Sequence, residues 1–279
     1  MIIDLHCHST ASDGALAPAE VVRRAALHGV EVLALTDHDD LSGLAAARVA
    51  AEAANIAFID GVEISVTWRG ATVHVLGLRI DPANAGLVAG LESVRSGRVQ
   101  RARAMSQELA AAGIEDVFEG AIRHAGNPAM IGRTHFARYL AQIGVVSEPR
   151  EAFKRYLVPG KPGYVPHRWA GLEDVVNWIV SAGGTAVIAH PGRYALSAEA
   201  MKELVGEFRE AGGEAIESVS SSHSRGQYRE FGELAAHFGI GVSAGSDFHG
   251  PGEGAELGSL PAPEAGARVV WADWPRCDG

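Results

Sequence analysis

The chain has 279 residues, a length usual for a single α/β barrel or for one core with an insertion. Its 47% hydrophobic and 21% charged residues are close to the average for a soluble globular protein. This composition excludes a disordered or fibrous chain, and no apolar run reaches the roughly 18–20 residues that span a bilayer. The net charge of −10 excludes a basic nucleic-acid coat protein, and two cysteines (Cys7 and Cys277) without a signal-peptide pattern predict a cytoplasmic protein.

Short apolar runs alternate with longer helical stretches along the chain. Residues 18–27 predict the first helix, because Pro18 suits a first helical turn. A second, alanine-rich helix is expected to end near Ala54, and Ser42 could cap its start. Strands are expected at seven places, with a turn at Arg69-Gly70 between the third and the fourth: residues 2–5, 30–35, 57–59 together with 62–66, 72–78, 185–188, 215–219 and 240–243.

The alternation of strands and helices indicates βα units, a mostly parallel sheet and an α/β fold. About seven strands fit a closed or nearly closed barrel, and an open doubly wound sheet is the alternative. Residues 98–168 break the rhythm with a long helical stretch that Gly-Pro segments interrupt. We therefore expect an inserted helical subdomain at 98–168, called the insertion below, within a barrel made of residues 1–97 and 169–279.

The insertion is basic within an acidic chain. It contains 11 Lys+Arg and 6 Asp+Glu, whereas the rest of the chain contains 13 basic and 28 acidic residues. This asymmetry suggests a surface that attracts anions beside a metal-rich acidic body. Chance clustering of basic residues on a solvated helical face explains the charge equally well. The charge alone therefore does not distinguish an anion-binding surface from chance, and the motifs must do so.

Two motifs of histidine and acid follow the first and the last predicted strands. His6 and His8 have i, i+2 spacing, which places both rings on one side of an extended segment, and Asp13 follows closely. Asp247 and His249 repeat this spacing. Imidazole and carboxylate are ordinary ligands of divalent metals, so both motifs favour a metal site over a structural role.

Four further polar residues lie in or directly after apolar strands. His38 stands among three acids, some of which helix capping explains, although capping does not explain the histidine. Glu63 lies in an apolar run, where a carboxylate needs either a salt bridge or metal ions. His190 directly follows a strand, whereas His74 lies inside one and would by itself be a hydrogen-bonded core histidine. All motifs except that of His74 fall on the carboxyl side of a strand, where parallel barrels place their active sites.

The ordered set HCHSTASDG, TDHD, GVEIS, HVLGL, AHPGR and SDFHG resembles the polymerase and histidinol phosphatase (PHP) family of metal-dependent phosphoesterases. The resemblance covers the chain except the insertion and the tail. It implies a distorted (β/α)7 barrel with up to three divalent ions, in which Glu63 bridges two of them. The implied ligand sets are His6, His8, Glu63 and Asp247; Glu63, His74 and His190; and Asp13, His38 and His249.

A narrower resemblance, to nucleoside 3′,5′-bisphosphate phosphatases, implies removal of the 3′-phosphate from adenosine 3′,5′-bisphosphate to give AMP. Within the insertion, IGRTHFAR and PGKPGYVP look like phosphate-binding elements of that subgroup. They indicate Arg133, His135 and Lys161 as substrate contacts, although Arg133 also fits an exposed helical charge. His223 lies in a serine-rich loop after a strand and is a candidate general acid or phosphate contact, or a structural loop histidine.

The donor types leave the metal open, since they suit Mn, Fe, Zn and Co, and the subgroup resemblance favours Mn²⁺. Two such ions would lower the pKa of a water for in-line attack on phosphorus, and Glu63 and His190 are the expected residues at the reacting centre. The expected partner is a small nucleotide or a short oligoribonucleotide, with no long duplex nucleic acid and no membrane.

Other activities fit the same ligands. They are a 5′-to-3′ exoribonuclease on short RNA and another phosphomonoesterase such as a histidinol phosphatase. A non-enzymatic, metal-stabilised binding or editing module is a further alternative, but the complete ligand set argues against it. An amidohydrolase acting on C–N bonds fits less well, because those enzymes carry a metal-bridging lysine after a strand and no lysine precedes Lys154.

Overall fold

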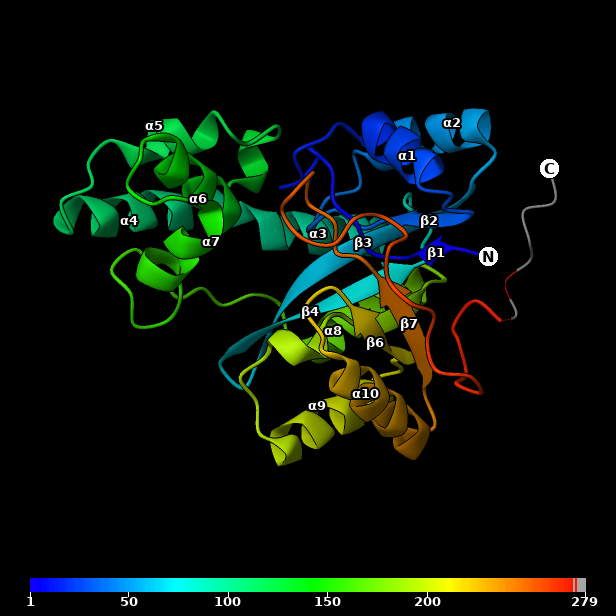
Figure 1. The fold of residues 1–279 in the computed structure, drawn as a ribbon. Coiled ribbons are helices and arrows are strands. Elements are labelled where there is room, and N and C mark those ends of the chain that lie inside the picture. Colours follow the sequence, from blue (N-terminus) through cyan, green and yellow to red (C-terminus); the bar gives the residue numbers. More distant parts are fainter. Residues whose placement is uncertain (273, 275–279) are drawn as a thin grey trace.

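The computed structural model describes residues 1–272 and 274. Seven strands form one sheet whose spatial order follows the chain (Figure 1). Neighbouring strands pair in parallel, except that β4 is antiparallel to β3 and to β5. Each strand lies where the sequence predicts one, and the two extended runs between 57 and 66 form one strand. The bounds are β1 (Ile3–Asp4), β2 (Val32–Leu35), β3 (Ala57–Trp68), β4 (Ala71–Leu78), β5 (Thr185–Ile188), β6 (Ala215–Ser220) and β7 (Gly241–Gly245).

The helices of the barrel cover the outside of this sheet. The first, α1 (Pro18–Leu27), has the predicted bounds. The prediction that Ser42 caps the second helix is wrong, because Gly43 is the N-cap residue and makes no side-chain bond there. Ser42 instead donates from its backbone N–H and its hydroxyl to Asp40 Oδ1, which orders the loop after β2. The remaining barrel helices are α2 (Leu44–Ala54), α3 (Ala85–Ser96), α8 (Leu172–Ser181), α9 (Ala198–Glu210) and α10 (Arg225–Phe238).

The sheet curls until its first and last strands meet. The Leu5 N–H donates to the Ala244 carbonyl at 3.1 Å. A Cβ on Gly245 would lie 2.3 Å from the His6 Cβ, so this approach requires glycine. The sequential strand order and this closure make a nearly closed barrel, which confirms the predicted fold over an open doubly wound sheet.

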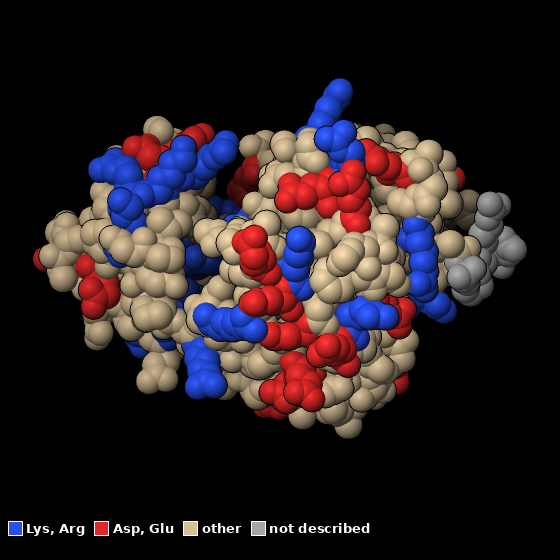
Figure 2. Space-filling model, turned by 90° about the horizontal axis from the view of Figure 1, so that it is seen from below, with Lys and Arg blue, Asp and Glu red and all other residues tan. Residues whose placement is uncertain are grey.

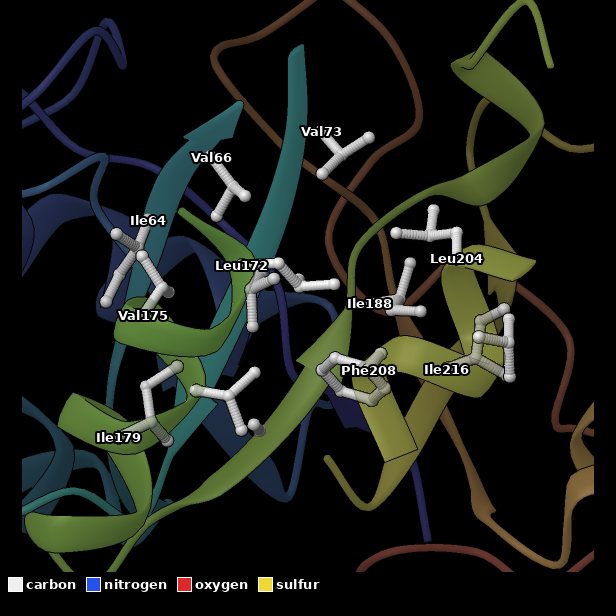
Figure 3. Close-up of a cluster of buried hydrophobic side chains, with 14 of the residues drawn as sticks. Ile64, Val66, Val73, Leu172, Val175, Ile179, Ile188, Leu204, Phe208 and Ile216 are labelled. Atoms are coloured by element: carbon white, nitrogen blue, oxygen red, sulfur yellow. The ribbon is translucent and has the colours of Figure 1, made fainter. Parts of the chain in front are cut away.

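Alternate residues of the strands face opposite sides of the barrel wall. On β4, Val75 packs outward in the cluster beneath α8 and α9, whereas Leu76 faces the interior. Figure 3 shows the outer cluster, in which Ile179 and Phe208 lie with Ile188 of β5. Each such buried side chain contributes about 1.5–3 kcal/mol, so the strands that carry the site stand on a rigid base.

The insertion leaves the barrel after α3 and returns at α8, and it lies to one side of the barrel (Figure 1). Its own buried cluster includes Met105, Leu109, Phe136 and Leu140. The insertion therefore has a small hydrophobic core separate from that of the barrel. Its helices are α4 (Arg98–Ala111), α5 (Val117–Ile122), α6 (Arg133–Gln142) and α7 (Pro149–Ala152), which continues into a π-helical turn (Phe153–Leu157).

The two cysteines are far apart in the chain. Cys7 is buried, and its Sγ donates to the Ala34 carbonyl at 3.2 Å. Cys277 lies outside the described residues. None of the helices in the described part of the chain is both long enough and apolar enough to cross a membrane.

Candidate metal centre

A first group of ligand atoms forms at the end of β1. His6 Nδ1 lies 2.9 Å from Glu217 Oε1 on β6, which leaves His6 Nε2 directed toward the group. His8 Nε2 lies 3.2 Å from His6 Nε2 and 3.2 Å from Asp247 Oδ1. With Glu63 these side chains offer ligand atoms that all lie within 4.8 Å of one another, and all four are buried. The group has the composition that the resemblance implied for the first ion.

Glu63 lies at the centre of the site. Its Oε1 faces His74 Nδ1 at 2.9 Å and His190 Nε2 at 2.8 Å. Its Oε2 faces His38 Nδ1 at 2.9 Å. The antiparallel direction of β4 explains how His74 reaches this point, because the beginning of β4 lies beside the carboxyl end of β3, where His74 pairs with Ser65. Two residues inside strands, Glu63 of β3 and His74 of β4, thus join ligand candidates that follow strands.

A third group gathers around Asp13. Its Oδ1 lies 3.3 Å from His249 Nε2 and 3.8 Å from His8 Nδ1, and its Oδ2 lies 4.0 Å from His38 Nε2. His8 therefore borders both the first and the third group. His38 likewise lies between Asp13 and Glu63, and it joins Glu63 and His74 in the second group of ligand atoms.

The donor set fits divalent metal ions. Several buried nitrogen and oxygen atoms of these residues have no hydrogen-bond partner, although such atoms are costly to bury unpaired. These atoms are His8 Nδ1, Asp13 Oδ1, His38 Nδ1, Glu63 Oε2, His190 Nδ1 and both carboxylate oxygens of Asp247. Ligand atoms from these side chains gather in groups within 4.8 Å of one another, an arrangement that suits cations, and the Arg193 guanidinium also contacts Asp247.

The charges inside the site keep its acids ionised. Burial alone would raise the pKa of Glu63, but neighbouring imidazoles, chiefly those of His38 and His74, hold this pKa well below its ordinary value. Burial, helped by the charge of Arg193, lowers the pKa of His190 to about 4, so this ring is neutral and able to ligate. Burial would also lower the pKa of His8, but its acidic partners raise it to about 10, so metal binding by this ring would require the loss of a proton.

Three residues at the strand ends adopt left-handed backbone conformations that non-glycine residues rarely take. They are Asp39 (φ 47°), His190 (φ 28°) and Asp247 (φ 54°), and such a conformation costs about 1–3 kcal/mol. Hydrogen bonds to buried partners hold all three. The Asp39 N–H donates to the Glu63 carbonyl at 2.8 Å. The His190 N–H donates to Glu217 Oε2 at 2.5 Å, and the Asp247 N–H donates to the His6 carbonyl at 2.8 Å. The surrounding structure therefore fixes the directions of these side chains.

A cleft lies between the barrel and the insertion, and both line it. Figure 2 shows basic side chains over the insertion, acidic ones gathered on the barrel, and further basic side chains set back in the hollow between them. The walls thus combine metal-ligand candidates with cations. They include Asp13, His38, His74 and His249 from the barrel ligands, the arginines Arg98, Arg101, Arg133 and Arg193, and the apolar side chains of Met130, Phe153 and Trp169.

The arginines of the cleft differ in their partners. Arg98 pairs with Asp39, and Arg193 pairs with Asp247. Arg101 and Arg133 make no salt bridge within residues 1–272 and 274, and bond only to backbone carbonyls. Burial, together with the charges of Arg133 and Arg98, lowers the pKa of Arg101 to about 10. This pair is therefore a source of positive charge without a protein counter-ion, which favours binding of an anion.

The structure separates the three predicted substrate contacts. Arg133 lines the cleft. His135, two residues further along α6, is fully buried, does not line the cleft, and accepts from the Gly132 N–H at 3.0 Å through Nδ1. Lys161 is exposed in the loop after the π-helical turn and does not line the cleft either.

His223 also lies outside the cleft lining, and both of its ring nitrogens are engaged. Nε2 accepts from the Gly192 N–H at 3.0 Å, and Nδ1 lies 3.0 Å from the Ser218 carbonyl. Nδ1 therefore carries the proton. The ring holds the turn formed by Pro191–Arg193, which follows His190 and presents Arg193 to Asp247.

Three residues that sequence reasoning missed belong to the site. Glu217 lies in a buried strand and carries the same signal as Glu63, an acid in an apolar run. Arg101 follows Arg98 at i+3, so both lie on one face of α4. Arg193 stands within the recognised AHPGR motif but was not singled out.

The comparisons with known proteins agree with this geometry. The chain is 52% identical to a 3′,5′-nucleoside bisphosphate phosphatase of Chromobacterium violaceum, over 97% of this chain and 95% of the relative. It is 42% identical to a 5′-3′ exoribonuclease of Haemophilus influenzae, over 91% and 92%. A solved structure titled as an amidohydrolase from Chromobacterium violaceum, with bound sulfate and no metal, has a TM-score of 0.95 at 52% identity and covers 97% of this chain and 95% of that one. The family model described as PHP domain matches residues 4–228, and the chain belongs to this family.

Proposed function

We propose that this chain is a metal-dependent phosphatase that removes the 3′-phosphate of nucleoside 3′,5′-bisphosphates, converting adenosine 3′,5′-bisphosphate to AMP and phosphate. The observation that carries this proposal is the shared cleft, in which barrel ligands stand opposite Arg101 and Arg133. A substrate with two phosphates matches a site with two separate attractions for anions. The name of the Chromobacterium violaceum relative supports the same activity.

Three divalent ions, Mn²⁺ in this proposal, would be held by the three ligand groups. Such ions lower the pKa of water and neutralise charge on phosphoryl oxygens. Glu63 would contact two of the ions, because its two oxygens face different imidazoles. Glu217 orients His6 through its Nδ1 and so directs Nε2 to the site, a support that commonly raises metal affinity.

The arginines divide between two tasks. Arg193 lies beside Asp247 at the edge of the first ligand group, where its guanidinium would contact the oxygens of the scissile phosphate. Arg101 and Arg133 would bind the remote 5′-phosphate. Each charge-assisted hydrogen bond of this kind contributes roughly 1.5–3 kcal/mol, and binding at the remote phosphate positions the ester for attack. His223 would support the turn that carries Arg193, since both of its ring nitrogens are engaged by backbone groups.

A second candidate is a 5′-to-3′ exoribonuclease acting on short RNA. It is favoured by the similarity to the Haemophilus influenzae enzyme over nearly the whole chain. The same ligand groups would hydrolyse a phosphodiester, and Arg101 and Arg133 would hold a 5′-terminal phosphate. An amidohydrolase activity has less support, since no lysine lines the cleft among the described residues and its cations suit phosphate. The bound sulfate of the solved relative is likewise a tetrahedral anion.

Steady-state kinetics on a panel of substrates tests the proposal. The panel contains adenosine 3′,5′-bisphosphate, 3′-AMP, histidinol phosphate, a 5′-phosphorylated RNA trinucleotide and an N-acyl amino acid, each with Mn²⁺ and with excess chelator. We expect adenosine 3′,5′-bisphosphate to have a kcat/KM at least about tenfold above that of 3′-AMP, because only it reaches both phosphate sites. Equal values for these two substrates would contradict the proposal, and a higher value for RNA would favour the exonuclease.

A further inference from the structure

Helix α6 of the insertion contacts one of the metal-ligand candidates directly. Thr134 Oγ1 donates to Asp13 Oδ2 at 2.9 Å, and Arg138 Nη1 donates to the Asp13 carbonyl at 2.7 Å. Residues four apart lie on the same face of a helix, so one face of α6 holds both the side chain and the backbone of Asp13. Two hydrogen bonds thus fix a residue that stands on a loop of the barrel.

Helix α6 also contacts the loop that carries His249, another member of the third ligand group. Arg138 pairs with Glu253, with Nη2–Oε2 at 2.6 Å and Nε–Oε1 at 3.1 Å. The Glu253 N–H in turn donates to the Gly250 carbonyl at 3.1 Å, directly after His249. Arg138 therefore connects the loop of Asp13 with the loop of His249.

These contacts leave the other Asp13 oxygen available. Oδ2 accepts from Thr134, whereas Oδ1 is buried, has no hydrogen-bond partner, and faces His249 Nε2 at 3.3 Å. A carboxylate fixed by one oxygen presents the second in a defined direction. Groups that fix ligands in this way commonly change metal affinity by about 10- to 100-fold.

We propose that Thr134 and Arg138 are positioning residues that couple docking of the insertion to metal binding at the group of Asp13, His38 and His249. The proposal rests on the metal-dependent function proposed above. Thr134 adjoins Arg133 in the first turn of α6, so the turn that faces the remote phosphate also orients a metal ligand. Docking of α6 would raise the affinity of this group for the ion. By thermodynamic linkage, the bound ion would favour the docked position of α6 by the same factor.

Metal titration of the chelator-treated full-length protein tests the coupling without any substrate. Thr134→Val keeps the shape of the side chain and removes the hydroxyl, and Thr134→Ser restores the hydroxyl. Isothermal titration with Mn²⁺ should show about tenfold weaker binding of one ion in Thr134→Val and near wild-type binding in Thr134→Ser. The affected ion should be the one that Asp13→Ala loses.

Asn127→Ala is the matched control, because Asn127 also joins the insertion to the barrel, through the Ala11 carbonyl and Asp40 Oδ2, without touching a ligand candidate. It should leave all Mn²⁺ affinities unchanged. Unchanged affinity in Thr134→Val, or an equal loss in Asn127→Ala, would overturn the coupling.

Hydrogen exchange supplies a second measurement that involves no turnover. Mn²⁺ should slow amide exchange in the first two turns of α6 in the wild type and in Thr134→Ser, and this slowing should be at least about fivefold smaller in Thr134→Val. Identical slowing in all three proteins would also overturn the proposal. Neither measurement uses a substrate, so both remain interpretable if the phosphatase assay fails. The coupling and the proposed function can therefore be rejected independently of each other.

Discussion

The barrel and the insertion contribute opposite kinds of chemistry to one cleft. The barrel contributes imidazoles and carboxylates that lie within or directly after its strands, above a packed hydrophobic core. The insertion contributes long cations from helices, among them Arg101 and Arg133, which lack an acidic partner among the described residues. On the proposed function, the barrel would supply the metal ligands, and the insertion would select the phosphate ester and position one ligand, Asp13. Four substitutions test this division.

The largest effect is expected at the bridging carboxylate. Glu63→Gln keeps the shape of the side chain but removes the negative charge that two cations would share, so at least one ion and nearly all turnover should be lost, about 10³-fold or more in kcat. Elemental analysis and kcat at saturating Mn²⁺ measure this. Glu52→Gln, on the exposed face of α2, is the matched control and should behave as wild type. Wild-type turnover in Glu63→Gln would make Glu63 a structural acid only.

A smaller effect is expected one step away from the ligands. Glu217→Gln weakens the hold on the His6 ring and removes a buried negative charge beside Nδ1. The affinity for one ion should fall about 10- to 100-fold while excess Mn²⁺ restores much of the turnover. Activity measured against Mn²⁺ concentration shows this as a shifted midpoint. A variant that excess metal does not rescue would indicate that Glu217 acts in the chemical step.

In the insertion, the effect should fall on substrate choice. Arg133→Ala removes a charge-assisted contact to the remote phosphate, so the ratio of kcat/KM for adenosine 3′,5′-bisphosphate over 3′-AMP should fall about tenfold. Bound metal should remain at the wild-type level by elemental analysis. Arg150→Ala removes the same charge from an exposed position of the insertion and serves as the control. Equal ratios in Arg133→Ala and wild type would remove the insertion from substrate selection.

The smallest effect is expected at Lys161, which the sequence indicates as a substrate contact. The side chain is exposed and outside the cleft lining, so Lys161→Ala should change kcat/KM for adenosine 3′,5′-bisphosphate by less than about twofold. A loss as large as that of Arg133→Ala would show that the loop of Lys161 closes over the substrate.

The two regions also differ in how far the sequence alone describes them. Metal ligands that follow a strand need particular residue types at a fixed spacing. The pairs His6 and His8, and Asp247 and His249, are therefore recognisable as short motifs in the sequence. His74 was readable only through the family resemblance, because the antiparallel direction of β4 is not encoded in its own pattern.

Substrate-binding cations leave a weaker local signal. An arginine reaches a phosphate from many positions on a helix, so the positive charge of the insertion indicated the chemistry without selecting the residues. Arg101 became apparent only when folding placed it beside Arg133, and His135 was seen to be enclosed only when α6 was packed. Glu217 was missed although it carries the signal that identified Glu63, since both are acids in buried strands.

The reversed direction of β4 has a consequence for the order in which the site assembles. Glu63 and His74 stand 11 residues apart across one hairpin, whereas His6 and Asp247 meet only when the two ends of the barrel close. Hairpins form in about 1–10 μs, long before contacts between distant segments of a barrel. We therefore expect the central carboxylate to acquire its first imidazole early, and the full ligand set to form only once the last strand has joined the first.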